Sequence, residues 1–300
     1  MNTPSADEHG PAAATPDGAR KRPPELEDWL NRHLYHPLSF RLARLLARTP
    51  VTPNMVSLAG GLAVALAAYF YAALSYPLSA LLGLGVHMSW HVLDGADGDL
   101  ARMTGKVSPT GEFVDGLCDY LGHIVMYLTL ASLVVPLLGI WAWPLGVFAG
   151  LSRAAQSNFY ESLRRNYEEW AYGREWLGSP EKQSKDSPRL VRAYLRGANS
   201  LLPLANDIGP LIFDPQIAPA ARHIIARHKG ALLAGLEPFG ANYRTIALGA
   251  AMMVQMPALY LVYEAVVLNI AAVWMVRRKR RMLNMIFSQL SNSQPSRTLR

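Results

Sequence analysis

The sequence predicts an all-α integral membrane protein with six transmembrane helices, and the distribution of charge along the chain is the main reason. Of the 300 residues, 51% are hydrophobic and 17% are charged, whereas an ordinary soluble domain has roughly 25% charged residues. No Lys or Arg occurs between Arg48 and Arg102, or between Lys106 and Arg153. Each of these two gaps is long enough for two crossings, because one crossing needs about 20 apolar residues.

A third gap without basic residues runs from Arg244 to Arg277 and holds two shorter crossings, which meet near Pro257. The even number of crossings follows from these three gaps. The predicted spans are residues 55–75, 78–97, 112–134, 138–158, 240–257 and 259–276.

The basic segments predict the orientation of these spans. The N-terminal arm, the loop with Arg102 and Lys106, the connection 159–239 and the run RRKRR at 277–281 are all basic, whereas the short connections on the other side carry no Lys or Arg. Because basic loops stay in the cytoplasm, we expect the chain to be integral to the cytoplasmic (inner) membrane with both termini cytoplasmic. The net charge of +7 then indicates attraction to anionic lipid rather than binding of nucleic acid.

The N-terminal part is predicted to have two segments. Residues 1–24 are rich in Pro, Ala and Gly and lack the apolar core of a signal peptide, so we expect a disordered tail. Residues 25–49 place Arg41, Arg44 and Arg48 at helical spacing with apolar residues between them. This pattern predicts an amphipathic juxtamembrane helix in the headgroup layer, with an ordinary soluble amphipathic helix as the alternative.

The rest of the chain is predicted to form one membrane domain over residues 50–287, with a polar connection at 159–239 and a disordered tail at 288–300. The first span should begin at Thr52, because Thr can cap a helix and the following Pro suits the first helical position. The single cysteine, Cys118, excludes an internal disulfide and is expected to be a small packing residue.

Four carboxylates sit at two predicted helix ends that face the cytoplasm. Asp94 and Asp97 are three residues apart, and Asp115 and Asp119 are four apart, so each pair shares a helix face. If the two helices are adjacent, the four carboxylates converge, although each ionised group at membrane depth costs about 2.5 kcal/mol or more. Divalent cations remove this cost and the mutual repulsion. Oxygen ligands favour Mg²⁺ or Mn²⁺, and four carboxylates suit two ions.

Small and basic residues accompany the carboxylates. Gly98 and Ala101 leave room for a flat group to approach the helix, Gly111 clears space at the start of span three, and Arg102 can bind a phosphate through two hydrogen bonds. Metals, a phosphate-binding Arg and a carboxylate base are the parts that phosphoryl transfer needs.

The carboxylates have two other interpretations. The first is a set of helix caps and loop charges. The second is a divalent-cation channel or transporter, which predicts acidic residues spread along a path across the membrane and leaves Arg102 unexplained.

The complete pattern resembles a known family. The signature D-x2-D-G-x2-A-R-x8-G-x3-D-x3-D of the CDP-alcohol phosphatidyltransferase family is matched at all eight fixed positions. The layout is similar to that of the compact bacterial six-span members. The preceding sequence T-P-N, which contains Asn54, also resembles the family. The matching residues are Asp94, Asp97, Gly98, Ala101, Arg102, Gly111, Asp115 and Asp119.

The resemblance implies an enzyme of phospholipid biosynthesis, a metal-dependent transferase in which an acceptor hydroxyl attacks the phosphate of a CDP-linked donor and CMP leaves. It implies that Asp94, Asp97 and Asp115 bind the metal ions. Asp119 would ligate metal and also act as the catalytic residue that takes the acceptor's proton. The CDP site would be lined by Gly98, Ala101, Arg102, Gly111 and Asn54. A homodimer is also implied, and the small residues Gly60, Gly61 and Ala65 could pack helices.

The choice of substrates stays open at this point. Chains of this length resemble enzymes that transfer a phosphatidyl group from CDP-diacylglycerol to a small polar acceptor, namely glycerol phosphate, inositol or its phosphate, or an amino alcohol. The reverse arrangement joins a CDP-linked small alcohol to a lipid acceptor such as diacylglycerol or a ceramide.

Several residues near the motif have two interpretations. Arg153, a lone charge in span four, either binds an anionic acceptor, with Arg164 and Arg165 nearby, or snorkels to the interface. Thr104 and Ser108 either contact donor phosphates or serve the helix ends. The histidines are expected to make polar contacts between helices rather than to bind metal: His87, His91 and His123.

Overall fold

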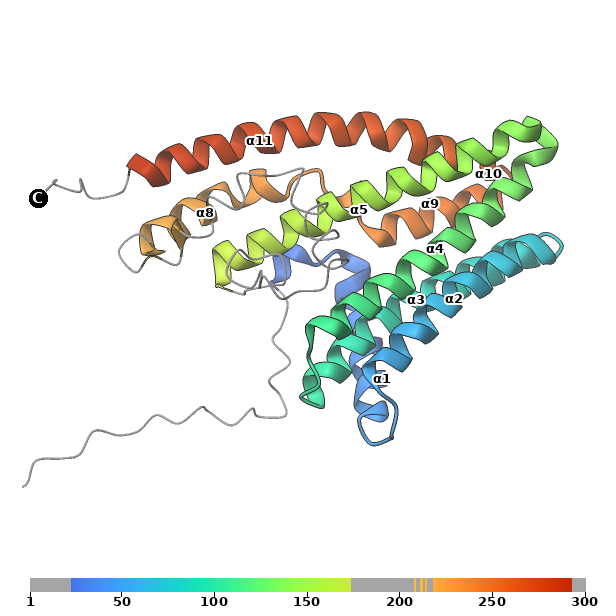
Figure 1. The fold of residues 1–300 in the computed structure, drawn as a ribbon, viewed down its shortest axis with the longest axis horizontal. Helices are drawn as coiled ribbons and strands as arrows, with labels where there is room; N and C mark the ends of the chain where they lie inside the picture. The colour runs from blue at the N-terminus through green and yellow to red at the C-terminus, as the bar shows by residue number, and fades with distance from the viewer. Residues whose placement is uncertain (1–22, 174–207, 209–210, 213, 215–217, 293–300) are drawn as a thin grey trace, which may run out of the picture.

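The computed structural model describes residues 23–173, 208, 211–212, 214 and 218–292, and every regular element among them is a helix. Figure 1 shows long helices that lie side by side along the longest axis of the molecule. Most of the predicted tails, and residues 174–207 of the polar connection, lie outside the described residues. The last helix continues to Asn292, into the segment predicted as the C-terminal tail.

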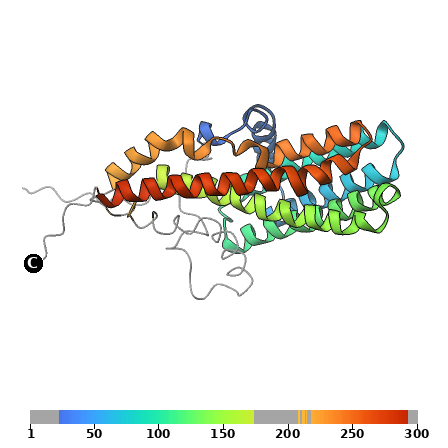
Figure 2. The same cartoon turned by 90° about the horizontal axis from the view of Figure 1, so that it is seen from above.

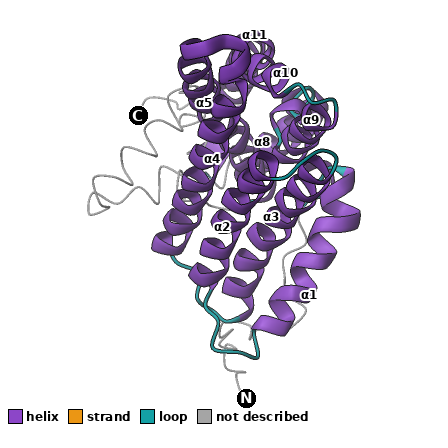
Figure 3. Ribbon diagram, turned by 90° about the vertical axis from the view of Figure 1, so that its right-hand side faces the viewer, coloured by secondary structure: helices purple, strands orange, loops and turns teal. Residues whose placement is uncertain are grey.

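The N-terminal segment contains a 3₁₀ turn, η1 (Pro24–Leu26), a π-helical turn, η2 (Asn31–Tyr35), and the helix α1 (His36–Leu46). Helix α1 packs against α3 (Leu78–Met103), as Figure 3 also shows. The contact is close, because a Cβ atom on Gly95 would lie 2.5 Å from the Ser39 Oγ atom. The Ser39 hydroxyl donates to the Val92 carbonyl at 2.9 Å. Helix α1 is therefore fixed beside the part of α3 that carries Asp94 and Asp97.

Helices α2 (Pro53–Ala73), α3 and α4 (Pro109–Leu138) form one packed unit. The predicted start of α2 is confirmed: the Thr52 side chain accepts a hydrogen bond from the Met55 amide at 3.4 Å, and Pro53 occupies the first turn. Helix α4 begins in the same way, with the Ser108 Oγ atom accepting from the Gly111 amide at 3.0 Å. Both caps satisfy amides that the helix itself leaves unpaired.

Two glycines set the distance between α2 and α4. A Cβ on Gly61 would lie 2.7 Å from the Cys118 carbonyl oxygen, and a Cβ on Gly122 would lie 2.7 Å from the Gly61 carbonyl oxygen. A larger residue at either position would push the helix backbones apart. Gly61 thus packs helices within this chain, and the neighbouring Gly60 faces Trp90 of α3.

Helix α4 turns through η3 (Gly139–Trp141) into α5 (Ala142–Tyr172), which packs back along α4. The C-terminal part contains α8 beside α11, which runs along the length of the molecule (Figure 2). Its elements are α8 (Ala218–Leu233), η5 (Glu237–Phe239), α9 (Ala241–Met253), α10 (Pro257–Val262), η6 (Tyr263–Val267) and α11 (Leu268–Asn292).

Three described helical stretches are long and apolar enough to cross a membrane: Pro53–Ala73, Thr110–Tyr172 and Pro257–Ser291. The second contains both α4 and α5. Helices cover most of each predicted span, but α3 and α9 are not among these three stretches. Helix α9 has only 13 residues, about 20 Å of helix, against a hydrocarbon core about 30 Å thick. Helix α9 is therefore shorter than the span predicted at 240–257.

The described helices have two main hydrophobic clusters. One lies within α2, α3, α4, α5, α9 and α10 and includes Val64, Trp90 and Leu130. The other joins the C-terminal half of α5 to α8 and α11 and includes Leu163 and Ile286. Part of the predicted polar connection 159–239 therefore contributes to a buried core, because its apolar residues are spaced to face one side of α5 and α8.

Candidate active site

Three of the four motif carboxylates lie together where α3 meets α4. Asp94, Asp115 and Asp119 each offer one carboxylate oxygen, and these oxygens lie within 4.8 Å of one another. Each residue is partly buried. A set of oxygen ligands at this spacing fits a hard divalent cation such as Mg²⁺ or Mn²⁺, which coordinates oxygen at about 2.0–2.1 Å in the case of Mg²⁺.

Asp97 lies next to this group but makes its own contacts. Its side chain is 5% exposed. The Ser57 hydroxyl of α2 donates to Oδ2 at 2.5 Å, the Gly98 amide donates to Oδ1 at 2.5 Å, and the side chain also reaches the Asp115 carboxyl. Tertiary packing thus brings the four aspartates of the motif to one place, three as a close group and one beside it.

Trp90 is a site residue that the sequence analysis missed. Its indole Nε1–H donates to the Asp119 Oδ1 atom at 2.7 Å, and its side chain is 4% exposed. Trp90 lies one helical turn before Asp94, so helical periodicity was the available signal. Ser57 was missed as well, because no local pattern links a serine in α2 to Asp97.

The residues expected at the CDP site line one cavity with the carboxylates. The cavity has a volume of about 1360 Å³ and is bordered by Asn54, Gly98, Ala101, Arg102 and Gly111. The Asn54 Oδ1 atom lies 3.6 Å from the position of a Cβ on Gly111. This volume falls slightly above the roughly 300–1,000 Å³ of ordinary ligand pockets.

Arg102 is exposed and folds back over its own helix. Its Nη2 group donates to the Asp99 Oδ1 atom at 2.5 Å. A Cβ atom on Gly98 would lie 3.4–3.8 Å from the Arg102 guanidinium, which is ordinary van der Waals contact. Arg102 thus lies directly beside Gly98. Thr104 and Ser108 serve helix ends, because the Thr104 hydroxyl donates to the Leu100 carbonyl at 2.8 Å and Ser108 caps α4.

Arg153 is connected to Asp119 through a histidine. The side chain of Arg153 is buried, borders the same cavity, and places Nη2 2.8 Å from the His123 Nε2 atom. An arginine can only donate hydrogen bonds, so Nε2 accepts and the proton of the neutral ring lies on Nδ1. That Nδ1–H then donates to the Asp119 backbone carbonyl at 2.8 Å. Arg153 is buried among polar partners, which differs from snorkelling to the interface.

A second basic group backs Arg153. Arg153 Nη1 lies 4.0 Å from a carboxylate oxygen of Glu264 in the π-helical turn η6, and Arg244 Nη1 donates to the other oxygen at 2.7 Å. Tyr260 also donates to Glu264, at 2.8 Å. Two guanidinium groups therefore face one carboxylate, and of the two arginines only Arg153 borders the cavity. The contacts of Arg153 and Arg244 with Glu264 join separate helices, so they do not follow from local sequence.

Arg164 and Arg165 were predicted to lie near Arg153. Arg164 and Arg165 border the cavity, but both are paired: Arg164 binds Glu161 and Glu168, and Arg165 binds Glu161 and Glu112. Both arginines therefore already have carboxylate partners at the cavity.

His91 and His123 make polar contacts between helices, as predicted, whereas both ring nitrogens of the buried His87 lack a hydrogen-bond partner among the described residues. His91 Nε2 lies 3.0 Å from the Thr245 Oγ1 atom of α9. His87 is buried next to His91 and His123. Among the described residues, the group of potential metal ligands contains aspartates alone.

The N-terminal segment forms one wall of the cavity. Asp28, Asn31 and His36 border it, and Asp28 Oδ2 accepts a hydrogen bond from the Asn242 side chain of α9 at 2.7 Å. Burial raises the pKa of the neighbouring Tyr35 to about 12. From the sequence, this segment was predicted only to lie in the headgroup layer, not to border the cavity.

Comparisons with known proteins agree with the motif. The family model described as CDP-alcohol phosphatidyltransferase matches residues 50–171. An archaetidylinositol phosphate synthase of Pyrococcus horikoshii is 37% identical over 97 residues, 31% of this chain and 49% of the relative. The archaetidylinositol phosphate synthase of Aeropyrum pernix is 35% identical over 89 residues, 30% of this chain and 44% of the relative. The chain spans about half the length of the curated relatives that it matches.

Proposed function

Because residues 50–171 form a CDP-alcohol phosphatidyltransferase domain, we propose that the chain transfers a phosphatidyl group from CDP-diacylglycerol to the hydroxyl of a small polar acceptor and releases CMP. One observation carries this proposal: Asp94, Asp115 and Asp119 present carboxylate oxygens within 4.8 Å of one another, in the cavity that Arg102 and Gly111 also border. Such an arrangement suits the pyrophosphate of a CDP-linked donor.

The proposed roles follow from the contacts. Asp94, Asp97, Asp115 and Asp119 would hold two divalent cations, Mg²⁺ or Mn²⁺, which when bound neutralise the pyrophosphate and acidify the attacking hydroxyl. Arg102 would leave Asp99 to bind a donor phosphate, since the Arg102 side chain is exposed. Asn54, Gly98, Ala101 and Gly111 would border the donor.

Asp119 would accept the proton of the acceptor hydroxyl. Trp90 orients one carboxylate oxygen of Asp119, and the His123 ring holds its backbone carbonyl. A carboxylate that is oriented by a hydrogen bond loses little freedom when the acceptor binds, which favours proton transfer to a fixed position.

Among the acceptors considered, we favour a phosphorylated polyol such as inositol phosphate. The relatives are named as synthases of archaetidylinositol phosphate. Arg153 borders the cavity, and the carboxylate of Glu264 that lies 4.0 Å behind it is already paired with Arg244, so Arg153 suits an anion. Arg153 would bind the acceptor phosphate.

The proposed setting is the cytoplasmic membrane, with six crossings and both termini in the cytoplasm. The basic run Arg277–Arg281, directly after the predicted span 259–276, supports this orientation. It places the carboxylates at the cytoplasmic end of α3 and α4, where a lipid donor enters from the bilayer and a polar acceptor from the cytoplasm.

Purified full-length protein in lipid nanodiscs tests the proposal. The protein is offered labelled CDP-diacylglycerol or a CDP-linked small alcohol with Mg²⁺ or Mn²⁺, each with candidate acceptors, and CMP release is measured with mass spectrometry of the product. We expect CMP from CDP-diacylglycerol only when a small polar acceptor is present. Release of CMP only from the CDP-linked small alcohol with diacylglycerol would establish the reverse reaction instead.

A further inference from the structure

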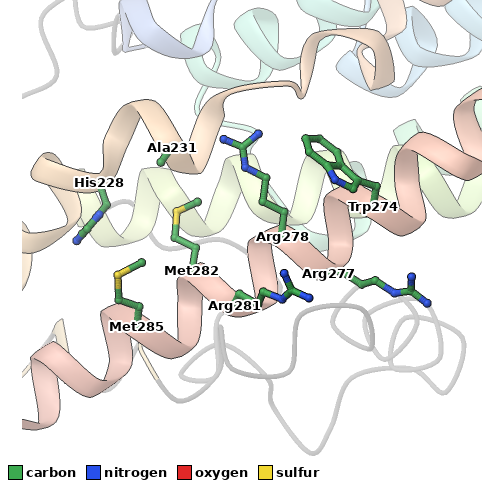
Figure 4. Close-up of a pocket in the computed structure, with 8 residues that line it drawn as sticks. All are labelled: His228, Ala231, Trp274, Arg277, Arg278, Arg281, Met282 and Met285. Atoms are coloured by element: carbon green, nitrogen blue, oxygen red, sulfur yellow. The ribbon is translucent and has the colours of Figure 1, made fainter.

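A pocket between α8 and α11 lies apart from the candidate active site. It has a volume of about 580 Å³, and Figure 4 shows Met282 and Met285 pointing from α11 toward α8, with Arg278 beside Trp274. The residues that border it are His228, Ala231, Trp274, Arg277, Arg278, Arg281, Met282 and Met285. Its floor is therefore apolar, and its rim on α11 is basic.

A buried lysine holds the two helices of this pocket together. Lys279 is 0% exposed, and its Nζ group donates to the Ala231 carbonyl at 2.8 Å and to the Ala234 carbonyl at 2.9 Å. These carbonyls belong to the C-terminal end of α8, where helix carbonyls have no partner within the helix. One cation of the RRKRR run thus has a structural role.

The other cations of the run point outward. Arg277, Arg278 and Arg281 are exposed, and none of them forms an ion pair with another residue in the part of the chain that the structure describes. Arg278 instead lies over the Trp274 ring, with its guanidinium carbon 5.3 Å from the ring centre. Three guanidinium groups along one pocket form a site for an anion, and arginine binds phosphate through two hydrogen bonds.

An exposed apolar strip leads directly to these arginines. Ile270, Val273 and Trp274 are 68%, 52% and 58% exposed. With Arg277, Arg278 and Arg281 they follow the spacing i, i+3, i+4, i+7, i+8 and i+11, which is one face of a helix. Apolar side chains of a membrane helix that end in Trp and then Arg match the change from acyl chain to headgroup.

We propose that this face of α11, closed on one side by α8, binds the phosphate of an anionic phospholipid at the cytoplasmic surface of the bilayer. The phosphate lies at Arg277, Arg278 and Arg281, and an acyl chain runs along Trp274, Val273 and Ile270. The strip selects a lipid over a soluble phosphate, because a free anion gains nothing from apolar contacts. The inference rests on the proposed membrane orientation but not on the transferase reaction.

The test is lipid binding by the purified full-length protein without any CDP-linked donor. Detergent-solubilised protein is titrated with phosphatidylglycerol or phosphatidylcholine, and native mass spectrometry measures the fraction bound. Each arginine near an anionic lipid contributes about 1 kcal/mol, so Arg278→Gln with Arg281→Gln should weaken phosphatidylglycerol binding at least about tenfold. Binding of phosphatidylcholine should not change.

A matched control separates the pocket from overall charge. Arg222 and Arg227 are exposed on α8 and do not border the pocket, so Arg222→Gln with Arg227→Gln makes the same change in charge. This pair should leave phosphatidylglycerol binding nearly unchanged. Equal losses in both double variants, or no loss in the first, would overturn the proposal. So would displacement of the lipid by millimolar inorganic phosphate. Arg277→Gln with Arg281→Gln replaces the first pair if that variant does not fold.

Discussion

Replacing Trp90 by Phe tests whether the hydrogen bond to Asp119 positions the proposed base and metal ligand. The substitution removes the indole N–H that lies 2.7 Å from Asp119 Oδ1. It keeps an aromatic ring where Trp90 packs edge-on against His123, with ring centres 4.8 Å apart. The change is therefore close to the removal of one hydrogen bond.

The expected size of the effect follows from that bond. A hydrogen bond to a charged group contributes about 1.5–3 kcal/mol, which corresponds to roughly 10–150-fold in rate. Residues that orient a metal ligand from behind typically change metal affinity or activity by about 10–100-fold. Trp90→Phe should therefore lower kcat/KM by about 10–100-fold and raise the metal concentration that gives half-maximal activity.

The assay is CMP release from CDP-diacylglycerol at increasing Mg²⁺ or Mn²⁺, with the Tm measured in parallel. Trp143→Phe is the control, because Trp143 is 39% exposed on α5 and does not border the cavity. A lower Tm alone would change the amount of active protein but not the metal concentration at half-maximal activity. If Trp90→Phe keeps both kinetic values within about threefold of the native protein, the positioning role is wrong.

Three further predictions concern the site and the fold. Gly122→Ala should destabilise the protein by about 1–3 kcal/mol, because the new Cβ would lie 2.7 Å from a backbone oxygen. The control Gly85→Ala should not lower the Tm, because the space around Gly85 is open. Equal Tm values for the two variants would contradict the close packing at Gly122. Asp115→Asn should lower CMP release at least about 100-fold at the metal concentration that saturates the native protein and raise the metal concentration for half-maximal activity, and unchanged activity and metal dependence would show that Asp115 is no ligand. Arg153→Ala should raise the acceptor's KM about tenfold or more and leave the donor's KM nearly unchanged, whereas equal changes in both would remove its assignment to the acceptor.

Local sequence was sufficient for those features that depend on short spacing. The start of α2 at Thr52 and Pro53 is confirmed, because capping involves residues within one turn. The pairing of Asp94 with Asp97, and of Asp115 with Asp119, on single helix faces follows from 3.6 residues per turn. Neither inference needs any knowledge of which helices are neighbours.

The predictions that fell short concern contacts between distant segments. Arg165 of α5 pairs with Glu112 of α4, a contact that the sequence did not predict. The connection 159–239 was expected to be a polar connection, but Leu163 and Ile225 belong to a buried cluster with α11. In each case the outcome depends on which helix packs opposite, and a window of sequence does not contain that information.

The sequence by itself determined the helical class, the motif and the faces on which its carboxylates lie, because charge gaps and helical periodicity are local properties of the chain. Only the tertiary structure decided that α2 supplies Ser57 to Asp97, that α5 supplies Arg153 to His123, and that Glu264 stands behind Arg153. These residues are brought together by the packing of separate helices, through close approaches such as that of Gly61 to Gly122. The free energy of such contacts is available only once the whole bundle has formed.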